Sequence, residues 1–174
     1  MRIVLVLIFS LLFMACSSVR VNYDYDREVD FSAYTTYNYF SDMQSGLSPL
    51  DEKRLLAVLD STLQSRGYRM VDEPDFLINI LSSEYQSGPR NSVGLGLGGG
   101  GRNIGGGISV GIPVGPPALK RNIQFDFVDA QRDVLFWQAF SESGYRDNAP
   151  PLAKEEKLRA LVKKVFSKFP PKGR

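Results

Sequence analysis

The clearest strand pattern of the chain is KRNIQFDFVDAQRDVLFWQAFS, at residues 120–141. Ile123, Phe125 and Phe127 alternate with polar residues, which is typical of a strand with one buried face. Turn-forming residues at 129–133 separate this strand from a second one at 134–141. The sequence therefore predicts a β-hairpin that turns Phe125 and Phe127 toward the core.

Two amphipathic helices flank this region in the sequence. Ser48 can cap a helix that begins at Pro49, and Gly67 can end it, so the first helix is predicted over 49–66. Its apolar face consists of Leu55, Leu56, Leu59 and Leu63. The last helix begins within 148–151 and stops before Pro170. Its broader stripe consists of Leu158, Leu161, Val162, Val165, Phe166 and Phe169.

Shorter patterns complete the strand list. Strands are predicted at 19–25, 34–40 and 76–85, and the apolar run of the last one favours burial on both sides. Residues 68–71 can begin a further strand, which Pro74 interrupts. The segment 88–117 holds 12 of the 16 glycines and 4 of the 10 prolines, and predicts two weak strands joined by a tip. This glycine-rich hairpin is either a mobile flap or an edge that pairs with a partner.

These elements give the order β-β-α-β, glycine-rich hairpin, β-β-α. Two amphipathic helices and a mainly antiparallel sheet imply an α+β two-layer sandwich with both helices on one face. We expect one domain over 19–171, with 88–117 as an insertion and 172–174 as a tail. Trp137, Tyr23, Tyr34 and Tyr37 are interpreted as core and cross-strand packing.

The amino terminus predicts the compartment. Arg2 is followed by a run over 3–15 that is apolar apart from Ser10. As a helix this run spans only about 20 Å, against about 30 Å for a bilayer core. Residues 1–15 therefore predict a signal peptide. The run ends in FMAC at 13–16, which resembles the lipobox of bacterial lipoproteins, where the chain is cut before a lipidated cysteine.

Cys16 is the only cysteine of the chain and the predicted site of lipidation. Residues 16–18 would then be the lipidated terminus and a short tether. Two or three acyl chains hold a protein durably to a membrane, at about 0.8 kcal/mol per buried methylene. Because Ser17 and not aspartate follows the cysteine, we expect the outer membrane, facing the periplasm. Alternative locations are the inner membrane and the cell surface. The alternative to lipidation is that Cys16 is a small buried apolar residue at the end of a transmembrane anchor.

Composition excludes several kinds of chemistry. The 174 residues include no histidine, and 21 Lys and Arg stand against 19 Asp and Glu, a net charge of +2. The absence of histidine excludes a Ser-His-Asp or Cys-His catalytic system and a histidine metal site. The single cysteine excludes an intrachain disulfide. The small net charge gives no global field that would favour nucleic acid. The GxGxxG pattern at 94–99 lacks a following helix, so no nucleotide or other cofactor is expected.

Carboxylates recur at two places. Asp24, Asp26, Glu28 and Asp30 occupy every second position, and would share one strand face as a calcium site or, as we favour, a solvated edge. Asp126, Asp129 and Asp133 surround the hairpin turn and suit turn geometry. We therefore expect neither catalytic nor metal-binding residues.

Cations gather in the last helix. At 100° per residue, Lys157, Lys164 and Lys168 fall within about 40° of one another beside the apolar stripe. They form either an ordinary solvated flank or a surface for a partner or for anionic membrane headgroups.

Several stretches together resemble one family. They are residues 24–26, 30–37, 125–129, 134–137 and 169–171, which occur with the glycine-rich middle in the family's order. The chain in this respect is similar to the bacterial lipoproteins of domain of unknown function 4136, over 19–171. It departs from them at the hairpin turn, where Arg132 or Asp133 stands in place of a usual glycine. It also has Gln138 and Ala139 where the family often has a glycine shortly after the tryptophan. The resemblance implies a periplasm-facing α+β lipoprotein and supplies no catalytic residue.

The sequence thus favours a non-enzymatic, membrane-tethered binding or scaffolding module whose partner is an envelope protein or lipid. One alternative is an enzyme that uses Ser and Lys or paired carboxylates on envelope polymers, which needs two carboxylates about 5–10 Å apart in a cleft. Another is a carrier of lipid or envelope polymer, for which an apolar cavity between helices and sheet is expected.

Overall fold

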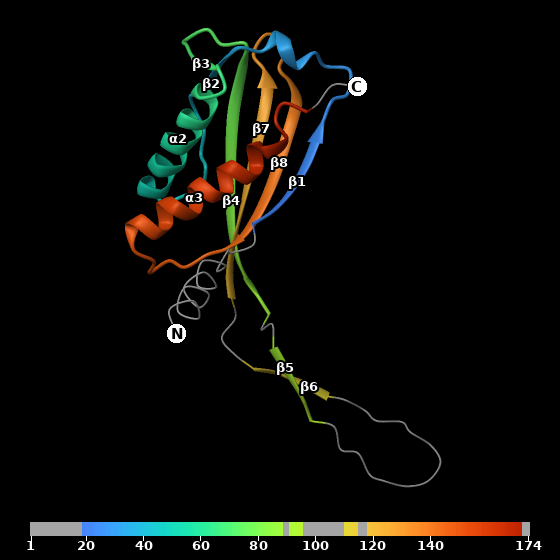
Figure 1. Ribbon diagram of the computed structural model, residues 1–174, viewed down its shortest axis with the longest axis vertical. Helices are drawn as coiled ribbons and strands as arrows, with labels where there is room; N and C mark the ends of the chain where they lie inside the picture. Colours follow the sequence, from blue (N-terminus) through green and yellow to red (C-terminus); the bar gives the residue numbers. More distant parts are fainter. Residues whose placement is uncertain (1–18, 89–90, 96–109, 115–117, 172–174) are drawn as a thin grey trace, which may run out of the picture.

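The computed structural model describes residues 19–88, 91–95, 110–114 and 118–171 (Figure 1). The predicted signal peptide, Cys16 with its tether and the tail at 172–174 lie outside these residues. In chain order the elements are β1 (Arg20–Tyr25), η2 (Phe31–Ala33), β2 (Thr36–Tyr39), α2 (Pro49–Gln64), β3 (Arg69–Met70), β4 (Phe76–Ser87), β5 (Asn91–Leu95), β6 (Val110–Val114), β7 (Ala118–Asp129), β8 (Val134–Gly144), α3 (Pro151–Val165) and η3 (Phe166–Lys168).

Among the described residues the fold is α+β, with a six-stranded sheet in the order β1-β8-β7-β4-β2-β3 and two α-helices. The predicted hairpin is confirmed, because β7 and β8 pair antiparallel from Lys120 opposite Gly144 to Asp129 opposite Val134. The sheet is mixed, and the long pairings of β1 with β8, β8 with β7 and β7 with β4 are antiparallel, as predicted. β2 pairs parallel with β4 and β3, since α2 carries the chain across and returns it in the same direction.

The prediction that β4 is buried on both sides is wrong. Phe76, Ile78 and Ile80 are fully buried, but Leu81 is 45% exposed and Tyr85 is also exposed. The buried side chains of the strands join those of α2 and α3 in one core cluster, and this cluster takes up only one face of β4. The opposite face of β4 is therefore half-buried or exposed.

Aromatic rings fill the core. Trp137 lies 4.7 Å from Phe127 and 4.9 Å from Phe169 between ring centroids, and Tyr34 stacks on Phe136 at 4.1 Å. Phe136 and Trp137 are neighbours in β8 and yet both are buried, because the register shifts between Phe127 and Val128. Trp137, Tyr34 and Tyr37 are buried and Tyr23 packs against the cluster, as predicted.

The helix boundaries follow local signals. Ser48 Oγ accepts the N–H of Asp51 and caps α2, which ends at Gln64, two residues before the predicted end. Gly67 has a φ of 93°, the left-handed conformation expected of a residue that ends a helix. α3 ends at Val165, and its predicted apolar stripe continues through η3 to Phe169, with every member buried.

Within the glycine-rich segment, β5 and β6 pair antiparallel as a separate two-stranded sheet. Val93 lies opposite Ile112, and Leu95 lies opposite Val110. Residues 96–109, which hold the predicted tip, lie outside the described residues, so the tip stays a prediction.

Candidate functional site

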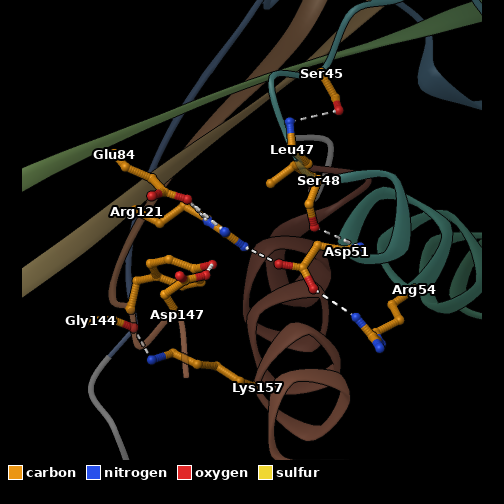
Figure 2. A network of polar contacts seen from close by, with 11 residues as sticks. Ser45, Leu47, Ser48, Asp51, Arg54, Glu84, Arg121, Gly144, Asp147 and Lys157 are labelled. Carbon is orange, nitrogen blue, oxygen red and sulfur yellow. Dashed lines mark hydrogen bonds and ion pairs between the residues drawn. The ribbon is translucent and has the colours of Figure 1, made fainter. Parts of the chain in front are cut away.

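Arg121 is the most deeply buried cation that the structure describes, with 6% of its surface exposed. The alternation of β7 places it on the same face as Ile123 and Phe125, near the start of the strand. Its Nε and Nη2 donate to Glu84 Oε1 at 2.9 and 2.6 Å, and its Nη1 donates to Asp51 Oδ2 at 3.1 Å (Figure 2). Its guanidinium carbon also lies 3.6 Å from the centroid of the Tyr145 ring. We call Asp51, Glu84, Arg121 and Tyr145 the Arg121 cluster.

The Arg121 cluster holds two carboxylates against one guanidinium, and Arg54 beside it supplies a second cation. Asp51 is buried in the first turn of α2, where a negative charge is favourable, and it also accepts from Arg54 Nη1 at 2.9 Å. Burial would lower the pKa of Arg121, but its bonds to Glu84 and Asp51 outweigh that effect and raise it. The cluster therefore ties β4, β7 and α2 together at one end of the sheet.

Lys157, the first of the three predicted surface lysines, is half-buried beside this cluster. Its Nζ donates to the carbonyl oxygen of Gly144 at the end of β8 (Figure 2). Burial lowers the pKa of Lys157, and the nearby charges of Arg146 and Arg121 lower it further.

Lys164 and Lys168 are exposed and lie beside the β1 edge of the sheet. The hydroxyl of Tyr23 donates to the carbonyl oxygen of Lys164 at 2.7 Å, and Lys168 Nζ lies 5.4 Å from the centroid of the same ring. We call Lys164 and Lys168 the lysine flank. The structure thus brings these two lysines together and separates them from Lys157.

The alternating carboxylates near the amino terminus do not share a strand face. β1 ends at Tyr25, Asp26 Oδ1 accepts the N–H of Glu28, and Asp30 Oδ1 accepts the N–H of Ser32 as the cap of η2. Both aspartates act as turn residues, because the chain leaves the strand before they occur. In the described ranges, no group of three or more Cys, Asp or Glu side chains is placed to hold a metal ion.

Asp129 closes the hairpin turn as predicted. Its carboxylate accepts the Tyr34 hydroxyl at 2.8 Å, Arg132 Nε at 3.0 Å, and the N–H groups of Gln131 and Arg132 at 3.0 and 2.8 Å. Burial alone would raise the pKa of Asp129, but these bonds outweigh it and lower the pKa to about 2. Asp126 lies on the other face of the sheet and accepts from Gln124 and Gln138.

Two surface hollows lie outside the aromatic core. The first, about 460 Å³, lies between the η2 region, Gly67 and Pro170. The second, about 700 Å³, runs between α2 and α3, and we call it the interhelical groove. Its charged lining residues are Lys53, Arg54, Arg66, Arg159, Lys163 and Glu155. The sequence analysis missed this groove, although Glu155, Arg159 and Lys163 recur every fourth residue and so share one helix face.

None of the helices among the described residues combines the length and the apolar character needed to cross a bilayer. The fold defines an α+β domain built on a mixed six-stranded sheet. A model of the family named Domain of unknown function (DUF4136) matches residues 21–171. The chain therefore belongs to this family, and the predicted resemblance is confirmed.

Solved structures show distant likeness. A PDZ domain protein from Parabacteroides distasonis matches with a TM-score of 0.53 and 13% identity, over 96% of this chain and 40% of the other. The PelC dodecamer from Paraburkholderia phytofirmans matches with a TM-score of 0.46 and 12% identity, over 86% and 96% of the two chains. This chain spans about two fifths of the first protein, and at this identity the likeness concerns the fold alone. No curated protein matches the sequence.

Proposed function

We propose that this protein is a lipid-anchored, non-enzymatic binding or scaffolding module of the cell envelope. In this proposal acyl chains on Cys16 hold it to the outer membrane, and a two-layer sandwich of helices over the sheet faces the periplasm. The observation that carries the proposal is the short distance along the chain between Cys16, in its lipobox-like context, and the first strand, which begins at Arg20.

The short tether gives the domain an orientation. Four residues span at most about 14 Å, since an extended chain advances about 3.3–3.6 Å per residue. Arg20 lies opposite Glu142 near the end of β8, and Lys120, near the start of β7, lies opposite Gly144. The anchor would therefore hold this end of the sheet, with the Arg121 cluster, close to the membrane.

Cations at the anchored end suit such a surface. Arg20 and Arg146 are exposed there, and anionic headgroups attract basic side chains within about a Debye length. Lys168 lies eleven residues beyond Lys157, which is about 16 Å along a helix axis. The lysine flank then lies farther from the membrane than Lys157, and suits a partner better than the lipid surface.

A binding role accounts for the polar groups better than catalysis does. Asp51 and Glu84 bind Arg121, and Asp129 binds Arg132, so these carboxylates are engaged in the fold. Hydrolysis by paired carboxylates needs two of them in one cleft. The smaller hollow is lined by one carboxylate, Asp30, and the interhelical groove by another, Glu155.

The lipid-carrier alternative needs space between the helices and the sheet. That space holds Phe127, Trp137, Phe166 and Phe169, whose ring centroids lie 4.7 to 5.9 Å apart in their closest pairs. An acyl chain would have to displace these rings, so a tethered binding surface is favoured over an internal lipid site.

Fractionation of cells that express the full chain tests this proposal. Wild-type protein is expected with the outer membrane after a high-salt wash, and Cys16→Ser is expected to be lost from that fraction. Lys164→Glu/Lys168→Glu serves as a control and is expected to remain with the membrane. Wild-type protein in the soluble fraction, or Cys16→Ser in the outer membrane at the wild-type level, would overturn the proposal.

A further inference from the structure

The interhelical groove concentrates positive charge. Of its charged lining residues, α2 and the turn after it provide Lys53, Arg54 and Arg66, and α3 provides Arg159 and Lys163. Glu155 is the one carboxylate among the lining residues. Five cations against one anion contrast with the near-neutral chain as a whole, which carries +2.

The cations are spread along the groove and are not gathered at one point. Lys53 and Arg54 lie in the first two turns of α2, and Arg66 lies just beyond its end at Gln64. From Arg54 to the end of the helix at Gln64 the helix axis alone rises about 15 Å. A single small anion cannot contact both ends of such a row, whereas an extended chain of anionic groups can.

Donors in the groove remain available to a ligand. Lys53 and Lys163 are exposed, and in the described part of the chain neither forms an ion pair. Arg159 donates to Glu155 at 2.7 Å, but its side chain is 68% exposed, and Arg54 uses one of its five N–H groups on Asp51. Arg66 is held in place by its bond to the carbonyl oxygen of Phe169 and by the ring of Phe166.

The groove is also separated from the lysine flank. At 100° per residue, Arg159 and Lys163 lie on the side of α3 that faces α2, and Lys164 and Lys168 lie on the side that faces β1. α3 and the η3 turn that continues it therefore carry two cationic surfaces. Substitutions on one of them change the net charge without altering the other.

We infer that the interhelical groove binds a linear polyanion whose repeating units carry carboxylate or phosphate groups. The inference rests on the proposed binding function and names its ligand class, but it does not depend on the lipid anchor. A planar membrane is a poorer fit, because the cations line a hollow between two helices, which a flat surface cannot enter.

Binding of the full chain in neutral detergent to three polymers tests the inference. The probes are polygalacturonate for carboxylates, linear polyphosphate for phosphates and dextran as an uncharged control. We expect binding to at least one polyanion, with weakening as salt is added and none to dextran. The polyanion bound more tightly identifies the anionic group that the groove prefers.

A pair of double variants with equal charge change locates the site. Lys53→Glu/Lys163→Glu is expected to weaken polyanion binding at least tenfold, because two attractive contacts become repulsive. Lys164→Glu/Lys168→Glu, on the other side of α3, is expected to change it less than twofold. Circular dichroism checks that both variants fold.

Vesicles of anionic phosphatidylglycerol are a fourth probe, for the membrane alternative. Two results would overturn the inference. They are binding to neither polyanion at low salt, whether or not the vesicles bind, and equal weakening of polyanion binding by the two double variants. Fractionation of the cells that express the same chain reports the anchor independently, so a failure of the groove is distinguishable from a failure of the proposed function.

Discussion

Arg121 of β7 donates to Asp51 of α2 at 3.1 Å, and both residues are almost completely buried. They lie 70 positions apart in the sequence. The bond therefore joins the β7–β8 hairpin to the first turn of a helix that precedes it in the chain. A buried ion pair adds little net stability over a well-packed apolar pair, but loss of one partner leaves an uncompensated charge.

Arg121→Met is therefore expected to lower the free energy of unfolding by about 3 kcal/mol, and the melting temperature by about 10 °C. The methionine keeps some contact with Tyr145 but leaves Glu84 unpaired and Asp51 with Arg54 alone. Thermal and urea unfolding measure the change. Arg159→Met, whose ion pair is exposed, is the control and should cost less than about 0.5 kcal/mol. If the two substitutions lowered the free energy of unfolding equally, the buried ion pair would contribute no more than the exposed one.

The lowered pKa of Asp129 predicts that the free energy of unfolding decreases in acid. Its pKa of about 2 in the folded protein is below the value of about 3.9 in an unfolded chain. Its contribution is therefore complete above the unfolded pKa and is lost as the pH falls from about 5 toward 2. Asp129→Asn should lower the free energy of unfolding by about 2 kcal/mol at pH 7 and by much less at pH 2. Asp133→Asn, in the same turn, serves as the control, and a destabilisation by Asp129→Asn that does not vary with pH would refute the assignment.

The raised pKa values of Tyr37 and Tyr39 predict that the protein also loses stability at alkaline pH. Both hydroxyls donate to Asp60 Oδ1, at 3.0 and 2.6 Å. Burial, together with the charge and hydrogen bonds of Asp60, raises the pKa of each tyrosine well above its usual value. The unfolded chain releases these protons near pH 10, so stability should decline above that pH. Tyrosinate absorbance should show both residues titrating only on unfolding, and Tyr37→Phe/Tyr39→Phe should leave the titration of the folded protein unchanged.

Gly46 and Gly67 both have a positive φ, of 71° and 93°, but their surroundings differ. A Cβ on Gly46 would lie 2.8 Å from the carbonyl oxygen of Ser82, whereas a Cβ on Gly67 would meet nothing within 4 Å. Gly67→Ala should therefore cost about 1 kcal/mol from backbone strain alone, and Gly46→Ala about 2–3 kcal/mol. Urea denaturation of the two variants compares them, and an equal loss would contradict the close approach to Ser82.

Local patterns were sufficient for most elements. The alternation around Phe125, the cap at Ser48 and the glycine at 67 each involve neighbours in sequence, so the hairpin and the bounds of α2 were predictable to within two residues. The parallel pairing of β2 with β4 was not predictable, because it depends on where α2 returns the chain. The exposure of Leu81 likewise depends on which face the helices cover.

The Arg121 cluster and the interhelical groove depend on tertiary structure even more than the strand pairing does. The alternation that buries Ile123 and Phe125 also places Arg121 on the buried face, so the burial of Arg121 could be predicted from the sequence. Its pairing with Asp51 and Glu84 could not be predicted, because these two residues come from other elements. The interhelical groove needs α2 and α3 side by side, and neither helix alone reveals it.

Intact mass spectrometry of the full chain purified from native membranes determines whether Cys16 carries a lipid anchor. We expect a mature protein that begins at Cys16 and carries the added mass of two or three acyl chains. A chain that retains residues 1–15, or one that begins at Cys16 with an unmodified thiol, would contradict it.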